Sequence, residues 1–108
     1  MKVDVFDSEN DKYIKIESIG KIKYIGESFG VDSLTDQNIY DCVGIEGEYI
    51  RVVDDSGEDY LYPINNPRPV DGSSKGGCWK VVKDEKGILK ILMDETKKFK
   101  IIISDKNE

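Results

Sequence analysis

NIYDCVGIEGEYIRVVDDSGEDYLY, the stretch from Asn38 to Tyr62, decides the fold because strand-forming runs alternate in it with tight turns. Three short runs are rich in Val, Ile and Tyr and alternate apolar with polar residues, as half-buried β-strands do. Between the first two runs, Glu46-Gly47 predicts a two-residue hairpin link. Between the last two, Asp54 to Gly57 predicts a type I turn that a glycine with positive φ closes. The stretch therefore predicts an antiparallel meander.

The same alternation predicts which side chains of the meander face the core. Ile50 and Val52 share one face of the second run. We expect Leu61 of the third run to join them, and Tyr60 and Tyr62 to face away. A shift of one residue would move every side chain of the strand to the opposite face, so this register is a testable prediction.

Further strand-like runs flank the meander on both sides. They are Lys2 to Phe6, Tyr13 to Glu17, Lys21 to Gly26, Cys78 to Lys83, Ile88 to Met93 and Phe99 to Ile103. Asp84 to Gly87 predicts a hairpin turn between the fourth and fifth of these runs, and Asp94 to Lys98 predicts a turn or a single helical turn. No stretch keeps a 3.6-residue period over three turns. We expect one mainly β domain spanning residues 1–108, an antiparallel barrel or sandwich.

The stretch from Pro63 to Gly77, residues 63–77, interrupts this series of strands. It holds all three prolines and ends in glycines and serines, which excludes a helix or a central strand. A loop of this length in a small domain is either functional or disordered, and both alternatives stay open. The Gly and Ser residues favour mobility at Asp71 to Gly77.

The segment from Leu34 to Pro63 resembles the SH3-like barrels found in small uncharacterised bacterial proteins. A Leu-Thr pair leads into a Tyr-containing strand, a hairpin follows, the next strand ends in Asp-Asp-Ser-Gly, and a Tyr-rich strand closes the series. The resemblance implies a small SH3-like β-barrel to which the N- and C-terminal strands are added. It implies no activity, and no functional residue is carried over from it.

Composition narrows the classes of partner and the location. The chain has 108 residues, of which 38% are hydrophobic and 35% charged, and its formal net charge is −6. A surplus of carboxylates argues against direct binding to nucleic acid, which requires Lys and Arg to face the phosphates. Met1 to Asn10 lacks the apolar run of a signal peptide, and no run is long enough to span a bilayer. We therefore expect a cytoplasmic protein without membrane contact, in which Cys42 and Cys78 are buried thiols.

The residues that commonly carry catalysis or bind metals are scarce. The chain has no histidine, so neither a Ser-His-Asp arrangement nor a usual zinc site can form. Four acidic residues surround the turn at Asp54, but their spacing is not that of a calcium loop, and exposed turn carboxylates are the simpler interpretation. The glycine-rich run from Gly72 to Gly77 lacks the ending of a phosphate-binding loop. We expect no enzyme activity, no metal and no cofactor.

The remaining candidates for a binding site are aromatic. Tyr60 and Tyr62 share a strand face, and with residues on neighbouring strands they would form an aromatic shelf beside acidic side chains. The candidate set is Tyr49, Tyr60, Tyr62, Trp79, Asp55 and Glu58. Such a shelf in an SH3-like fold binds proline-rich or basic peptides, whereas ordinary cross-strand packing of the rings is the alternative.

The function expected from these observations is a non-enzymatic protein-interaction domain with an acidic surface. Its partner would be a protein or peptide, and a basic one suits the charge. One alternative is an acidic neutraliser of a basic partner, such as an immunity-type or nucleic-acid-mimicking inhibitor. An alternative of another class is a small enzyme that uses carboxylates alone. For the oligomeric state we expect a monomer or a weak dimer.

Overall fold

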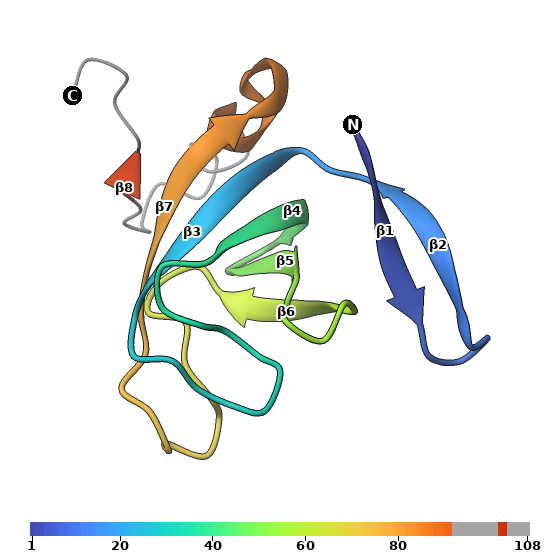
Figure 1. Cartoon of the computed structure of the whole chain (residues 1–108). Helices are drawn as coiled ribbons and strands as arrows, with labels where there is room; N and C mark the ends of the chain where they lie inside the picture. The colour runs from blue at the N-terminus through green and yellow to red at the C-terminus, as the bar shows by residue number, and fades with distance from the viewer. Residues whose placement is uncertain (92–101, 104–108) are drawn as a thin grey trace.

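The structure, a computed structural model that describes residues 1–91 and 102–103, is a mainly β domain (Figure 1). Its strands are β1 (Lys2–Asp7), β2 (Lys12–Glu17), β3 (Gly20–Gly26), β4 (Ile39–Glu46), β5 (Tyr49–Val53), β6 (Asp59–Pro63), β7 (Gly77–Asp84) and β8 (Ile102–Ile103). A short 3-10 helix, η1 (Glu85–Gly87), follows β7, and residues 88–91 are helical.

Seven of these strands are paired antiparallel, in two sheets. β1 and β2 form a hairpin of their own, and the other sheet has the order β6-β5-β4-β3-β7-β8. The expected mainly β, antiparallel fold of barrel or sandwich type is thus confirmed, with the N-terminal strands as additions. The two-residue β8 is the exception, because it pairs with β7 in parallel. Parallel pairing requires a crossover connection, and the helical residues 88–91 carry the chain away from β7 instead of turning it straight back.

The larger sheet curls around one apolar core. Its buried members come from β3, β4, β5, β6, β7, the loops between them and the helical segment after β7: Ile22, Tyr24, Phe29, Leu34, Tyr40, Cys42, Ile50, Val52, Tyr62, Ile64, Trp79, Val81 and Leu89. β6 and β7 are not neighbours in the sheet, yet Nε1 of Trp79 on β7 donates to the carbonyl of Pro63 at the end of β6, at 3.1 Å. This bond brings the two halves of the curled sheet together across the core.

Both predicted turns of the central meander form. Gly47 has a φ of 62° and Gly57 a φ of 88°. The first link consists of Gly47 and Glu48 and so lies one residue later than expected; a glycine at the first of two link positions is typical of a type II′ hairpin turn. In the second turn the Gly57 N–H donates to the Asp54 carbonyl at 3.0 Å.

The predicted strand from Ile88 to Met93 is wrong where the structure describes it, because residues 88–91 are helical. The carboxylate of Asp84 accepts hydrogen bonds from the N–H groups of Leu89 and Lys90, at 2.6 and 2.9 Å, and so holds the start of this helical segment. Leu89 is fully buried in the core. Residues 92–101 lie outside the described residues, and with them the whole predicted turn from Asp94 to Lys98 and most of the predicted final strand; Ile102 and Ile103 do lie in a strand.

Two long loops lie side by side at one end of the sheet (teal and gold in Figure 1). The first covers residues 27–38 and the second residues 64–76. Glu27 connects them: its N–H donates to the Gly76 carbonyl at 3.1 Å, and its carboxylate accepts from the N–H of Lys75 at 3.1 Å. These bonds give the second loop defined contacts at its C-terminal end, while its mobility stays a prediction.

Candidate functional site

The register of β6 is the opposite of the one that the sequence predicted. Tyr62 is paired with Ile50, Tyr60 with Val52, and Leu61 with Arg51. The two tyrosines therefore share the inner face of the hairpin, whereas Leu61 lies on the outer face and is 40% exposed. The prediction that Leu61 belongs to the core is wrong. The apolar alternation of β6 fits either face, and the aromatic rings fill the core better than a single leucine would.

Two members of the predicted aromatic shelf are core residues. Trp79 is fully buried, and Tyr62 is only 9% exposed. Their ring centroids are 6.4 Å apart, and Trp79 also packs edge-on against Tyr24 at 5.7 Å. These contacts correspond to the alternative of cross-strand packing, and they bury most of both rings in the core.

The acidic turn between β5 and β6 is held by tyrosine hydroxyl groups. Tyr62 donates to the buried carboxylate of Asp54 at 2.6 Å, and Tyr40 donates to Asp55 at 2.9 Å. Burial raises the pKa of both tyrosines, and the adjacent carboxylates raise it further. Asp55 also accepts from the hydroxyl of Thr35 at 2.8 Å, which ties the turn to the loop 27–38. Asp55 thus holds the fold together at this turn.

The other two turn carboxylates also have partners. Glu58 accepts from the hydroxyl of Tyr60 at 3.2 Å, and its negative charge raises the pKa of that hydroxyl. Asp59 lies 3.7 Å from the guanidinium of Arg51, which Glu46 also contacts at 2.8 Å. Within residues 1–91 and 102–103, no group of three or more metal-ligating side chains could hold a metal ion.

Tyr49 is an exposed member of the predicted set and lines both grooves described next, whereas the buried Tyr62 borders only the larger one. Tyr60 is 47% exposed but lies at the turn end of β6, beside Glu58. Tyr49 lies on the outer face of β5, is 48% exposed, and is paired with Pro63 at the opposite end of β6. The structure therefore separates the six predicted residues into a core pair, a turn group and Tyr49.

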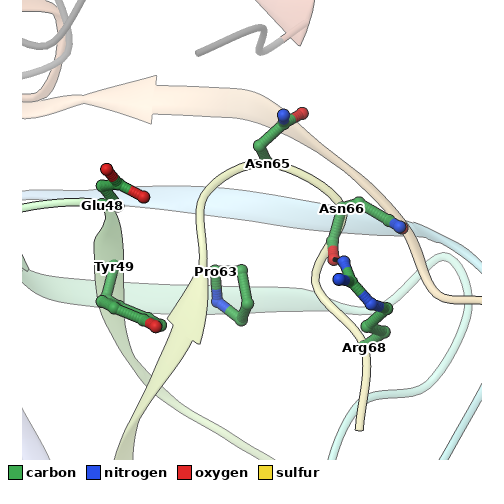
Figure 2. Close-up of a pocket in the computed structure, with 6 residues that line it drawn as sticks. All are labelled: Glu48, Tyr49, Pro63, Asn65, Asn66 and Arg68. Carbon is green, nitrogen blue, oxygen red and sulfur yellow. Dashed lines mark hydrogen bonds between the residues drawn. The ribbon is translucent and has the colours of Figure 1, made fainter. Parts of the chain in front are cut away.

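Two grooves meet at Tyr49, Pro63 and Arg68. The smaller one has a volume of about 410 Å³ and is lined by these three residues with Glu48, Asn65 and Asn66. Figure 2 shows Glu48 and Tyr49 on one side of this groove and Asn66 and Arg68 on the other, with Pro63 between them. The guanidinium of Arg68 donates to the backbone carbonyl of Asn66 at 3.0 Å, which holds the side chain against its own loop.

The larger groove, here called the edge groove, lies along β6 and has a volume of about 500 Å³. It is lined by Phe29, Gly30, Ser33, Tyr49, Leu61, Tyr62, Pro63, Arg68, Pro69, Val70, Asp71 and Ser73. Its lining thus combines β6 with both long loops, and it is mainly apolar. Tyr49, Leu61 and Val70 are exposed apolar side chains gathered around this one concavity.

The sequence did not single out Leu61, Pro69 or Val70 as site residues. One signal could have indicated the last two: they belong to the proline-rich loop, whose length is typical of either a functional or a disordered loop. The alternation in β6 predicts Leu61 in the core, whereas the opposite register exposes it.

Comparisons with known proteins add no relative. No protein-family model matches the chain, and neither curated proteins nor solved structures gave a match. Over the part of the chain that the structure describes, no helix is long and apolar enough to cross a membrane.

Proposed function

We propose that this chain is a protein-interaction domain and that the edge groove is its binding site. The observation that carries the proposal is the gathering of Tyr49, Leu61 and Val70, three exposed apolar side chains from separate segments, around one concavity. Apolar side chains that line a hollow and are rimmed by polar groups are characteristic of binding sites. Here Asp71 and Ser73 supply polar groups of the rim.

Excess negative charge supports a partner with basic groups. The chain carries 22 acidic and 16 basic residues. Of the two arginines, Arg51 is paired with Glu46 and Asp59, and Arg68 contacts its own loop. A positively charged partner would approach such a surface faster than a neutral one.

Partner capture by the immobilised domain tests the proposal. Leu61→Asp and Val70→Asp each place a charge in the groove, and we expect either change to weaken capture by about tenfold or more, ~1.4 kcal/mol. Ile39→Asp is the matched control, because Ile39 is a strand residue that is 49% exposed and lies outside both grooves. Circular dichroism and thermal melting verify that each variant is folded.

Equal capture by the wild type and all three variants would contradict the proposal. If capture also disappeared when salt was raised, the acidic neutraliser would be the better explanation, because exposed charges are screened by salt. Capture that survives salt and is lost only in the two groove variants supports the edge groove.

A further inference from the structure

β6 is an edge strand, and the alternation of its backbone hydrogen bonds shows which groups face outward. The Asp54 N–H donates to the Glu58 carbonyl at 3.1 Å, and the Ile64 N–H donates to the Glu48 carbonyl at 3.0 Å. These bonds lie at the two ends of the β5–β6 ladder and identify the even-numbered residues as the hydrogen-bonded ones. The N–H and C=O groups of the odd-numbered residues of β6 therefore point away from β5.

Leu61 is the central residue of this outward set. Among the residues that the structure describes, no strand pairs with the outer edge of β6. Pro63 has no N–H, and its carbonyl already accepts from Trp79. The N–H and C=O of Leu61 are thus a donor and an acceptor at an open edge, and such an edge is a template for another strand.

The edge groove lies beside this open edge. Leu61, Tyr62 and Pro63 contribute to it from β6, while Ser33 and Val70 contribute from the two loops. Its volume of about 500 Å³ is within the range of sites that enclose a ligand. A single extended segment needs only one strand spacing, about 4.8 Å, beside β6. A whole second sheet would need more room than a single segment, and the loops that line the groove restrict that room.

Charge selects among the extended segments that would fit. A second copy of the chain would bring another net charge of −6 to the same edge. A segment that carries Lys or Arg would instead meet Asp71 at the groove, which Arg68 also lines, and Glu58 at the acidic turn, where Asp59 already faces Arg51. Apolar residues at alternate positions of that segment would contact Leu61 and Val70, because side chains of a strand alternate between its two faces.

We propose that β6 binds an extended basic peptide by strand addition, with Leu61 donating one backbone hydrogen bond to it and accepting another. The proposal rests on the proposed function and specifies its geometry and its class of partner. Main-chain bonds of this type supply affinity, while the pockets beside them select side chains.

A capped synthetic peptide of about six residues, in which Val and Lys alternate, is the probe. It is titrated into isotope-labelled protein while the amide resonances are followed. We expect the amides of Asp59 and Leu61 to shift most and the Leu61 amide to become protected from solvent exchange. The same peptide with N-methyl groups on alternate residues has no N–H donors along one edge, and the methyl groups obstruct that edge, so we expect it to bind about tenfold more weakly or worse. A peptide that alternates Val and Glu tests the charge, and we expect it to bind more weakly as well.

The outcomes separate strand addition from the proposed function. Suppose that the Val-Lys peptide binds, that Leu61→Asp and Val70→Asp weaken this binding, and that N-methylation of the peptide does not. The groove is then a binding site and strand addition is wrong. If the Val-Glu peptide binds as tightly as the Val-Lys peptide, the basic class of partner is wrong. Absence of shifts with every peptide overturns strand addition whatever the capture experiment shows. A further outcome is that the amide resonances at β6 shift with protein concentration and that sedimentation shows a dimer. A second copy of the chain is then the occupant, and the peptide proposal is overturned.

Discussion

The two faces of the β5–β6 hairpin have similar sequences and opposite environments. The inner face carries Ile50, Val52 and Tyr62, which are all buried, whereas Tyr49 and Leu61 on the outer face are 48% and 40% exposed. Both faces contain a tyrosine and an aliphatic residue, so hydrophobicity alone does not distinguish them. The difference shows that the environment of a strand residue depends on what the rest of the chain places against each face.

Ile50→Ala and Leu61→Ala test this difference most strongly. Ile50 is fully buried, so we expect its truncation to lower the free energy of unfolding by about 2–5 kcal/mol. Leu61 is on the solvent side, and we expect its truncation to lower it by less than about 1 kcal/mol. Denaturant titration measures both values. A loss for Leu61→Ala as large as that for Ile50→Ala would mean that Leu61 is in the core and that β6 has the opposite register.

The two tyrosines of β6 sharpen the comparison, because they share the inner face but differ in burial. Tyr62 donates to the buried carboxylate of Asp54, and Tyr62→Phe removes that donor. We expect this change to lower the free energy of unfolding by about 1–3 kcal/mol, because the Asp54 carboxylate stays buried without this hydrogen bond. Tyr60 is 47% exposed, and Tyr60→Phe should leave the unfolding free energy within about 0.5 kcal/mol of the wild type. Equal effects of the two changes would contradict a special role for the buried pair.

Alkaline pH gives a second measurement of the Tyr62 site. Burial and the Asp54 carboxylate raise the pKa of Tyr62 above its ordinary value of 10.0. Above that pH the unfolded chain releases the Tyr62 proton while the folded chain keeps it. The contribution of the protonated hydroxyl to the free energy of unfolding is therefore complete below pH 10 and is lost as the pH rises further. The difference in stability between the wild type and Tyr62→Phe should therefore begin to narrow near pH 10 and narrow further as the pH rises. A constant difference would show that Tyr62 titrates alike in both states.

The turn of the hairpin provides the smallest expected effect. Gly57 has a φ of 88°, and a Cβ there would meet no atom within 4 Å, so Gly57→Ala tests the backbone conformation alone. We expect Gly57→Ala to lower the free energy of unfolding by about 1 kcal/mol, because alanine is strained at positive φ. Gly44→Ala in β4 is the matched control: its φ is not positive, and its nearest contact would be the Cβ of Arg51 at 4.0 Å. Equal melting temperatures for Gly57→Ala and the wild type would contradict this account of the turn.

Local chemistry made the turns and the strands of the meander predictable. Glycine at positions 47 and 57 supplies the positive φ that the turns require, and this preference needs no distant partner. The segment after β7 was less predictable. The residues from Ile88 onward have the apolar content of a strand, and only the bonds from Leu89 and Lys90 to Asp84 favour a helical start.

The sequence by itself determined the mainly β class, the central meander, its turns and the negative charge, because period-two patterns and turn residues act over a few neighbouring positions. Only the tertiary structure decided which face of β6 is buried. That choice depends on Trp79 and Phe29, which are distant in sequence from Tyr62 but pack against its ring. The tertiary structure also forms the edge groove, because β6 and the two loops make its walls together. Long-range packing selects between two faces that local alternation leaves equivalent, and so it places Leu61 at the surface and Tyr62 in the core.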